Sequence, residues 1–559
     1  MNKLILTATA FSIATNLVAQ EDKRPNILVI LADDLGFSDL GCFGGEIATP
    51  NLDKMATDGI RVTQMYNSSR SCPTRASLMT GLYAHQAGVG HMNVKSKKSK
   101  RPRGYAGFRS MADNVTIAEV LKDADYFTAM AGKWHLGVGN SSPVARGFQE
   151  YYGLLGGFTS MWKEDNYNRL PVGREAITYG DDFYATTAIT DHALEFIEMA
   201  KEKEQPLFLY LAYNAPHFPL HAPKNVIDKY VDIYSKGWDV IRDERWKRIV
   251  DMNLMQGEPE MSPRGVVPES FFVHEGHDLP AWNSLSKAQQ KDLARRMAIF
   301  AAMVDIMDQN IGRVFNALEE SGEMENTFVI FMSDNGACAE WHEFGFDERS
   351  DVHYKIHKGK ELDQMGQPGT YHHYGTGWAN ACGTPFSYYK HYSFEGGISM
   401  PCIVKYGNNI SDKGSINHTP LHITDVMATA VELANAKYPS KYQGRKILPL
   451  EGRSILPILK NEAIEDKYIF NEHEGNRMVR YGDWKLVSAH CHKDEWELYN
   501  IAEDRTEQHN LAADNPEMVK EFEKKYFEWA ERSYVMYFPE FWEQYGNTNQ
   551  VQLKKYKSR

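Results

Sequence analysis

Two pairs of acidic and amide side chains directly follow two apolar runs of the sequence. Asp33 and Asp34 come after the first run, and Asp334 and Asn335 come after a run about 300 positions later. Three carboxylates and one amide oxygen are hard ligands, which favour Ca²⁺ or Mg²⁺ over Zn²⁺. Either pair alone could be a strand-end turn or a helix cap. The repetition after two apolar runs predicts a metal site.

Cations and proton carriers follow two further apolar runs. Lys133 and His135 follow one of them and His217 follows the other, while Lys390 lies in a Tyr-Tyr-Lys segment. A lone His is more often a structural hydrogen-bonding group than a catalyst. Here, however, both His follow runs that are typical of buried strands. We therefore expect these side chains to join the metal site.

The stretch 71–81 combines a hydroxyl, a helix start and an Arg. Pro73 suits a first helical turn, where its missing N–H costs nothing. We expect Ser71 to cap this helix, at the end of the dipole that attracts anions. Arg75 lies one turn further and can reach back to it. An ordinary capped surface helix is the alternative interpretation of this stretch.

A divalent cation, an Arg, two Lys, two His and a hydroxyl together suit the hydrolysis of an anionic ester. The cations would stabilise the developing oxyanion, the hydroxyl would be the nucleophile, and a His would protonate the leaving oxygen. Residue types and spacing therefore predict a phosphate or sulfate ester hydrolase.

The elements that must position these residues alternate between strands and helices. This order predicts an α/β fold with a doubly wound, mostly parallel sheet. Ligands bind outside the carboxyl ends of the strands in such sheets, so the polar clusters should converge there. The expected strands are Asn26–Ala32, Tyr126–Ala131, Pro206–Ala212 and Thr327–Met332, and the expected helices are Thr116–Lys122, Tyr184–Ala200 and Ser286–Glu320.

The sequence changes character after the large domain, which we place at 24–460. Short strand patterns at 477–480, 484–487 and 496–499 are joined by tight turns, and Pro516 opens a helical pattern that runs to about residue 534. We therefore expect a smaller C-terminal subdomain, 461–559, with an antiparallel sheet and a helix. Three long segments of the large domain, 153–182, 238–285 and 339–385, are expected to form walls of a substrate pocket or plain surface decoration.

Composition and charge exclude some partners. The 559-residue chain has a formal net charge of −12, which gives no basic footprint for nucleic acid. The basic run 95–103 is expected to be a solvated loop, or a surface that steers an anionic substrate. The 6 Cys match no metal or redox motif. We expect mostly free, buried thiols, with Cys338 and Cys382 as the first pair to test for a disulfide.

Residues 1–19 have the pattern of a signal peptide, with Lys3, an apolar run and a small residue at the end. A buried N-terminal helix is the alternative. No other segment approaches ~18 continuous apolar residues, the length of a membrane span. We therefore expect an exported protein, periplasmic or secreted, with no membrane partner.

The motifs resemble those of type I sulfatases, which belong to the alkaline-phosphatase superfamily. Ser71, Pro73, Arg75 and 79–81 match the family's first signature in register, with Thr74 as a departure, since Ser or Ala is usual there. The run Gly132-Lys133-Trp134-His135-Leu136-Gly137 resembles the second signature. The matches extend from Pro25 to about Gln508, and the runs at 33–36 and 45–51 are most similar to the bacterial arylsulfatase branch.

This resemblance implies two cofactors and a partner enzyme. Residue 71 would be converted to formylglycine by a radical maturase, which works without oxygen. Cys72 is not the expected precursor, because Pro73 and Arg75 would then be out of register. The resemblance also implies a Ca²⁺ ion, with the ligands Asp33, Asp34, Asp334, Asn335 and the modified residue 71.

The resemblance also implies a role for each remaining site residue. Arg75 and Lys133 would orient the hydrated aldehyde, of which one hydroxyl attacks sulfur. Lys390 and His217 would hold the sulfate and assist the leaving oxygen, with His217 as the acid. His135 would then take a proton from the second hydroxyl, so that sulfate leaves and the aldehyde is restored.

The implied substrate is a sulfated carbohydrate, and the arylsulfatase branch favours galactose or N-acetylgalactosamine in host glycans. Two alternatives stay open: a phosphonate or phosphodiester hydrolase of the same superfamily, and a non-catalytic protein that binds sulfated glycans. The candidate substrate-binding residues at the rim are His85, His91, Asn93, Trp162, His372, His373, His473 and Arg477.

Overall fold

A large mixed sheet forms the centre of the molecule in the computed structural model, which describes residues 24–91, 111–257, 259–267, 276–340, 342–348, 353–489 and 495–535. The strand order is β11-β2-β10-β9-β1-β6-β3-β4-β5, and β12 pairs with β2. The strands are β1 (Asn26–Ala32), β2 (Ile60–Tyr66), β3 (Phe127–Gly132), β4 (Glu150–Gly153), β5 (Asn168–Leu170), β6 (Leu207–Ala212), β9 (Thr327–Ser333), β10 (Ser399–Lys405), β11 (Ile416–Asn417) and β12 (Leu421–His422).

The middle of the sheet is parallel, as predicted. β1 pairs in parallel with β9 on one side and with β6 on the other, and β6 pairs in parallel with β3. β10 is antiparallel to both of its neighbours, and β5 is antiparallel to β4. β2 and β10 did not stand out in the sequence, although β10 is the second strand from β1 and β2 is the third.

Alternate residues of β1 pack on opposite faces of the sheet, which explains its continuous apolar run. Leu28 and Ile30 belong to one core, with α1, α4 and α8, whereas Val29 and Leu31 belong to the other, with α2, α3 and α12. The helices are α1 (Pro50–Asp58), α2 (Ser71–Thr80), α3 (Ile117–Asp123), α4 (Ala185–Glu202), α8 (Lys287–Glu320) and α12 (Asp425–Leu433). The predicted helices at 116–122, 184–200 and 286–320 are thereby confirmed to within two residues.

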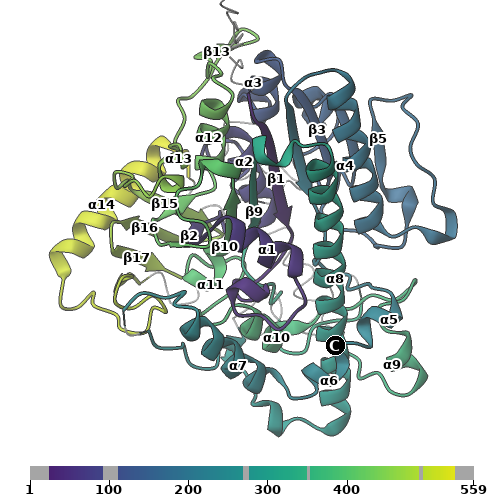
Figure 1. Ribbon diagram of the computed structural model, residues 1–559. Helices are drawn as coiled ribbons and strands as arrows, with labels where there is room; N and C mark the ends of the chain where they lie inside the picture. Colours follow the sequence, from purple (N-terminus) through teal and green to yellow (C-terminus); the bar gives the residue numbers. More distant parts are fainter. Residues whose placement is uncertain are drawn as a thin grey trace, which may run out of the picture.

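The segments inserted after β6 and β9 gather at the carboxyl end of the sheet, at the bottom of Figure 1. The segment 238–285, which we expected to be a pocket wall or surface decoration, begins with a helix of 14 residues. These segments contain α5 (Lys224–Ile227), α6 (Val231–Tyr234), α7 (Trp238–Asp251), the short strands β7 (Val266–Val267) and β8 (His277–Asp278), α9 (Lys360–Gln364), α10 (Gly375–Cys382) and α11 (Glu395–Ile398).

A smaller antiparallel sheet follows in the C-terminal part, as predicted, with α14 packed on it at the left of Figure 1. Phe522, Tyr526 and Trp529 recur at helical spacing and bury one face of α14 against the sheet. The domain boundary at 460 stays a prediction. The remaining elements are β13 (Lys441–Tyr442), β14 (Arg445–Lys446), α13 (Leu456–Leu459), β15 (Ile469–His473), β16 (Asn476–Tyr481), β17 (Trp484–Ser488), β18 (Glu497–Asn500) and α14 (Pro516–Arg532).

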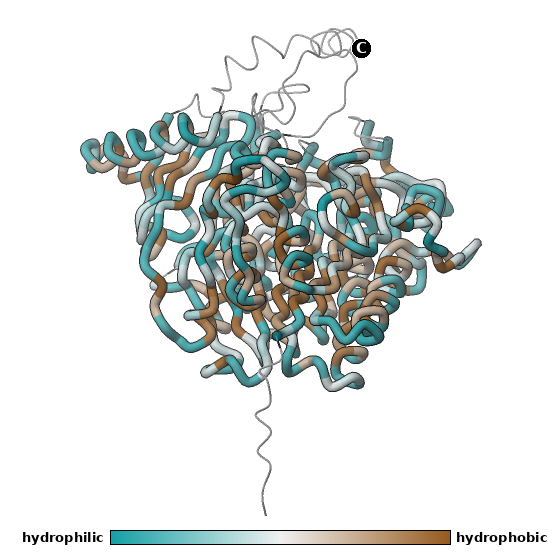
Figure 2. The backbone as a smooth tube through the Cα atoms, turned by 90° about the horizontal axis from the view of Figure 1, so that it is seen from above, coloured by the Kyte–Doolittle hydropathy of each residue, from teal (hydrophilic) through white to brown (hydrophobic). Residues whose placement is uncertain are grey.

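The distribution of apolar residues fits this layered architecture. Hydrophobic segments concentrate in the interior and hydrophilic segments on the outer helices and loops (Figure 2). Within the described part of the chain, no helix has the length and apolarity needed to cross a membrane. Among the described residues, Cys42, Cys338, Cys382 and Cys402 are free and buried. The prediction of mostly free, buried thiols is thus confirmed, and Cys338 and Cys382 form no disulfide.

Candidate active site

The register of the parallel strands brings the predicted polar clusters together. Ala32 lies beside Ser333 on neighbouring strands, so Asp33 and Asp334 follow at the same level. On the other side of β1, β6 ends at Ala212, beside the end of β3 and therefore beside Lys133. Residues 300 positions apart thus meet at one sheet edge, as expected for a doubly wound fold.

Ser71 lies at the first position of α2, not at its cap. The helix begins at Ser71 and its N-cap is Arg70, without a side-chain cap hydrogen bond. The predicted capping role of Ser71 is therefore wrong, and the hydroxyl is instead used by its neighbours. Arg75 Nε donates to Ser71 Oγ over 3.0 Å, and His135 Nδ1 lies 3.4 Å from the same oxygen. Arg75 does reach back one turn, as predicted.

Three buried carboxylates meet three buried cations around this hydroxyl. Arg75 donates to Asp334 over 2.8 and 3.1 Å. Lys133 Nζ lies 2.6 Å from Asp33 Oδ2. Lys390 Nζ lies 3.0 Å from Asp34 Oδ1, and His217 Nε2 lies 3.4 Å from Asp34 Oδ2. The groups expected to form one site are therefore in mutual contact.

The environment shifts the pKa of each carboxyl group. Burial and the neighbouring Asp334 raise the pKa of Asp33 well above its usual value, against Lys133 and Arg75. Burial would also raise the pKa of Asp34 and Asp334, but nearby cations lower both. Asp34 and Asp334 thus retain negative charge because cations are close. A cluster of this kind is typical of a functional site.

Two buried oxygens of this cluster fit a metal ion. Within the described residues, neither Asp33 Oδ1 nor Asn335 Oδ1 has a hydrogen-bond partner. Asn335 Nδ2 donates to Asp34 Oδ1 over 2.7 Å, so this amide is held against the other carboxylates. An unsatisfied buried oxygen is costly, and a hard cation would satisfy both. The possible metal-ligand atoms of Asp33, Asp34 and His217 also lie within 4.8 Å of one another.

The two His of the site are neutral bases. Burial lowers the pKa of His135 well below its usual value, and Lys133 and Arg75 lower it further. Burial likewise lowers the pKa of His217 to about 4, although Asp34 opposes this. His217 Nδ1 lies 2.6 Å from the carbonyl oxygen of Phe218, which must accept a hydrogen from it. The Nε2 lone pair of His217 is therefore available in the pocket.

Unusual backbone angles occur where the strands end in this site. Asp34 and His135 have φ of 71° and 58°, in the left-handed region that non-glycine residues rarely adopt. Strain of this kind persists where the surrounding structure fixes it, and it is frequent at active sites. Close packing also limits the loop after Asn335, because a Cβ at Gly336 would lie 1.9 Å from the Gly396 oxygen.

The predicted rim residues do not form one group. His91 and His473 lie together, next to Glu474. His85 is buried against Glu472, and Trp162 donates to the Gly366 oxygen. Three other predicted positions pack elsewhere: His372 contacts Asp347, His373 stacks on Phe346, and Arg477 lies over the Trp496 ring. Asn93, the basic run 95–103 and residues 1–19 lie outside the described residues.

Sequence reasoning missed a chain of charges that leads from Lys390 to the C-terminal sheet. Lys390 Nζ lies 3.1 Å from Glu340 Oε1, which lies 3.9 Å from His391 Nε2. His391 in turn contacts Glu474, which pairs with Arg70 across 404 positions of sequence. No local motif marks these residues. The adjacency of Arg70 and His391 to predicted site residues was the only available signal.

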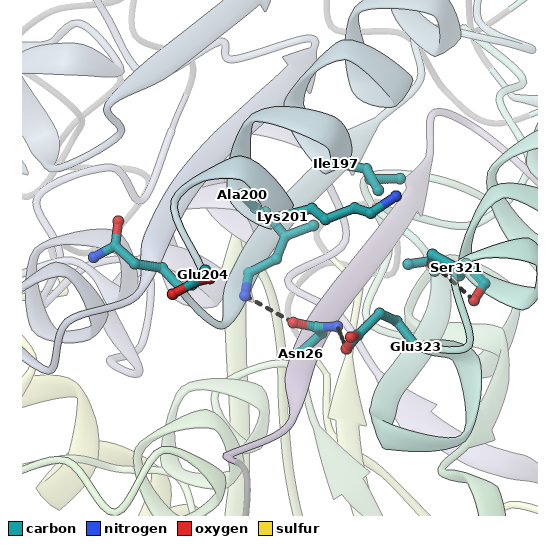
Figure 3. Close-up of a pocket in the computed structure, with 10 residues that line it drawn as sticks. Asn26, Ile197, Ala200, Lys201, Glu204, Ser321 and Glu323 are labelled. Atoms are coloured by element: carbon teal, nitrogen blue, oxygen red, sulfur yellow. Dashed lines mark hydrogen bonds between the residues drawn. The ribbon is translucent and has the colours of Figure 1, made fainter.

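A separate cavity of about 180 Å³ lies at the opposite, amino-terminal edge of the sheet. Figure 3 shows Asn26 in this cavity, at the start of β1, with Lys201, Glu204 and Glu323 around it. Asn26 donates to Glu323 over 3.1 Å and accepts from the Leu207 amide, so it joins the starts of two strands. This cavity is remote from the carboxylate cluster, and its polar groups are used by the fold.

The fold and the site together define a hydrolase of anionic esters. A buried hydroxyl at a helix start faces an Arg, two Lys, two His and a set of hard oxygen ligands at the carboxyl edge of a doubly wound sheet. This arrangement stabilises negative charge on a transferring group and provides bases for proton transfer.

Comparison with known proteins identifies the class further. A profile of the Sulfatase family matches residues 25–436, and a profile described as N-sulphoglucosamine sulphohydrolase, C-terminal, matches residues 385–532. The chain therefore belongs to the sulfatase family, and it is a sulfuric ester hydrolase.

Individual relatives agree with this family. An arylsulfatase of Klebsiella aerogenes is 34% identical over 82% of this chain and 96% of its own length. An uncharacterized sulfatase of Schizosaccharomyces pombe is 33% identical over 90% of this chain and 92% of its own length. The crystal structure of Ps i-CgsB has the same fold, with a TM-score of 0.65 and 24% identity over 93% of this chain and 97% of its own.

Proposed function

We propose that this sulfatase hydrolyses sulfate esters of carbohydrates and that it uses formylglycine at position 71. The observation that carries the proposal is the position of the Ser71 hydroxyl, 3.0 Å from Arg75 Nε and 3.4 Å from His135 Nδ1, beside the carboxylate cluster. A plain Ser could form a sulfate ester but would then need water to break it. The hydrated aldehyde of formylglycine supplies a hydroxyl that attacks sulfur and a second hydroxyl that permits elimination.

The residues around position 71 have separate tasks in this proposal. Arg75 and Lys133 hold the group at position 71 in place through charge and hydrogen bonds. Lys390 binds the sulfate oxygens, and His217 gives a proton to the leaving sugar oxygen. His135, which contacts Ser71 Oγ, takes the proton that is lost in the elimination step. Burial lowers the pKa of both His, so each is a neutral base in the free protein. This suits His135 as a base, and the negative charge of a bound sulfate favours the protonated His217 that the acid role needs.

A calcium ion fits the oxygen cluster, and Asp33, Asp34, Asp334 and Asn335 would hold it. When bound, it would supply positive charge that stabilises the sulfate oxygens in the transition state. The unpartnered Asp33 Oδ1 and Asn335 Oδ1 support this assignment. The absence of Cys and His from the ligand set supports Ca²⁺ over Zn²⁺.

Within the carbohydrates, we propose galactose or N-acetylgalactosamine residues of host glycans as the sulfated sugars. A relative 25% identical to this chain is the N-acetylgalactosamine-6-sulfatase of Rattus norvegicus. A relative that is 26% identical is the N-acetylglucosamine-6-O-sulfatase of Bacteroides thetaiotaomicron, which makes glucosamine the competing sugar. Export through the signal-peptide pattern at 1–19 and maturation by a radical maturase complete the proposal.

A panel of substrates tests this function. The protein is produced with a radical maturase, and peptide mass measurement checks that residue 71 has lost two hydrogens. We expect sulfate release from monosulfated galactose or N-acetylgalactosamine and from an aryl sulfate, with little release from an aryl phosphate diester. Faster hydrolysis of the phosphate diester would replace sulfatase by phosphodiesterase function. Preference for sulfated glucosamine would contradict only the proposed sugar.

A further inference from the structure

Four side chains surround the carboxylate of Glu474, which lies at the turn between β15 and β16. Arg70 Nη1 and His91 Nδ1 lie 2.9 and 3.0 Å from Glu474 Oε1. His391 Nδ1 and His473 Nε2 lie 3.2 and 3.7 Å from Glu474 Oε2. The reaction proposed above gives this cluster no task, although it lies beside the active site.

The ring of His473 has a fixed tautomer. Its Nδ1 lies 3.2 Å from the carbonyl oxygen of Gly90. Because a carbonyl oxygen can only accept, Nδ1 carries the hydrogen, and the neutral ring has its lone pair at Nε2. The side chain is 0% exposed, and in the described part of the chain its Nε2 has no hydrogen-bond partner.

The Nε2 lone pair therefore faces a carboxylate oxygen of Glu474 without a donor between them. Two such acceptors repel each other unless a cation lies in the gap. Burial lowers the pKa of His473 well below its usual value, which favours the neutral ring. Glu474 opposes this shift, and Arg70, His391 and His91 add to it.

We propose that His91, His473 and Glu474 bind a divalent transition-metal ion, with zinc as the best match. Their three ligand atoms lie within 4.8 Å of one another. Zinc bonds to nitrogen and oxygen are about 2.0–2.2 Å, so ligand atoms of a tetrahedral site are roughly 3.3–3.6 Å apart. The separations of 3.0 and 3.7 Å from Glu474 to the two rings bracket this range.

The surroundings support the ligands in the way that known metal sites do. Metal-bound His usually donates its other ring N–H to a carbonyl or carboxylate, as His473 does to Gly90. The turn itself is braced, because the Gly475 amide donates to Glu472 Oε1 over 2.8 Å and Asn476 donates to the His473 oxygen over 3.1 Å.

The backbone of the turn is also unusual. Glu474 has a φ of 52°, in the left-handed region that this type of turn normally fills with Asn, Asp or Gly. A Glu at this position is strained, and strain that persists is frequent at ligand sites. Two imidazoles and a carboxylate leave the fourth position of a tetrahedral zinc open, next to Arg70.

A second group of possible ligands, Asp347, His357 and His372, is a suitable internal control. Arg296 Nη2 already binds both carboxylate oxygens of Asp347, at 2.7 and 2.9 Å. His357 Nδ1 lies 2.8 Å from Asp292 Oδ1. The carboxylate charge of this second group is thus satisfied by Arg296, and we expect no transition metal there.

The experiment titrates the full-length protein with Co²⁺ and then Zn²⁺ while Ca²⁺ is kept saturating. We expect one Co²⁺ per chain with the visible absorption of a tetrahedral site, and its displacement by one Zn²⁺. His473→Asn keeps a side-chain donor for the Gly90 oxygen but removes the Nε2 ligand, so it should weaken Zn²⁺ binding more than about 100-fold. The readout does not depend on sulfatase activity or on residue 71.

Matched variants separate a metal site from misfolding. Glu474→Gln should also lose Zn²⁺, whereas His357→Asn should bind it as the unmodified protein does, and circular dichroism identifies any variant that fails to fold. The proposal is overturned if the unmodified protein binds no Zn²⁺, or if His473→Asn and Glu474→Gln both retain it. It is equally overturned if His357→Asn alone loses the metal.

Discussion

Arg75 connects Ser71 to the carboxylates of the proposed metal site. Its side chain is fully buried and donates to Ser71, to Asp334 and to the backbone oxygen of Lys133. A buried cation of this kind is stable only with its partners, and removal of one partner of a buried ion pair typically costs about 3–5 kcal/mol. Position 71, Asp334 and the end of β3 are therefore held as one unit by a single side chain.

Calcium should stabilise the folded protein through this unit. The account predicts that Ca²⁺ raises the thermal unfolding midpoint and that a chelator lowers it. At free Ca²⁺ about 100 times the dissociation constant, linkage gives roughly 2.7 kcal/mol. Differential scanning calorimetry with excess Ca²⁺ or with a chelator measures the difference.

Asn335→Leu provides the matched variant, since it removes the unpartnered amide oxygen but keeps a similar volume. We expect the variant to lose most of the Ca²⁺-dependent shift. A midpoint that does not respond to Ca²⁺ in the unmodified protein would contradict the metal assignment. An undiminished shift in the variant would remove Asn335 from the ligand set.

At the scale of elements, a buried ionic network joins the C-terminal sheet to the large domain. Lys485 of β17 lies 2.9 Å from Glu395 at the start of α11 and 2.7 Å from Glu507. Arg505 Nε donates to Glu395 over 2.7 Å. Since α11 follows the Lys390 loop, this network helps to position Lys390 relative to the smaller sheet.

The network predicts a pH dependence of stability. Burial raises the pKa of Glu507 to about 7, and Glu395 adds to this effect against Lys485. The unfolded carboxyl has an ordinary pKa near 4.3. Between about pH 4.3 and pH 7 the folded state therefore binds more protons than the unfolded state. The stability that protonated Glu507 contributes is fully present below the unfolded pKa and is lost as pH rises through about 7.

Glu507→Gln should remove this loss. Denaturant unfolding from pH 5 to pH 8 should show the unmodified protein losing about 1–3 kcal/mol relative to the variant. Glu517→Gln on α14, where the side chain is 85% exposed, is the control and should leave the pH profile unchanged. Parallel profiles for the unmodified protein and Glu507→Gln would show that Glu507 does not titrate in this range.

At the scale of the whole molecule, the sequence predicted the parallel core and its ligand edge well. Runs such as 26–32 are apolar on both faces because helices cover both sides of the sheet, and this signal is local. The antiparallel strand β10 was missed because its position depends on pairing with β2, which lies more than 300 residues earlier.

The site was predictable where residues directly follow strands and not where distant loops meet. Asp33 and Asp334 converge because their strands are adjacent in register. Glu474 and Arg70 meet only because a hairpin of the smaller sheet reaches the start of α2. Arg477, which we expected at the rim, instead packs over the Trp496 ring. Side chains alternate between the two faces of a strand, and the sequence alone did not show which face of β16 is turned toward the pocket.

The most direct test of the central claim is sulfate release by two single variants of matured protein. Ser71→Ala removes the oxygen that contacts Arg75 and His135, whereas Cys72→Ala changes a buried thiol that belongs to the apolar core. The account predicts that Ser71→Ala releases no sulfate above background and that Cys72→Ala retains activity. Activity in Ser71→Ala together with its loss in folded Cys72→Ala would contradict the account.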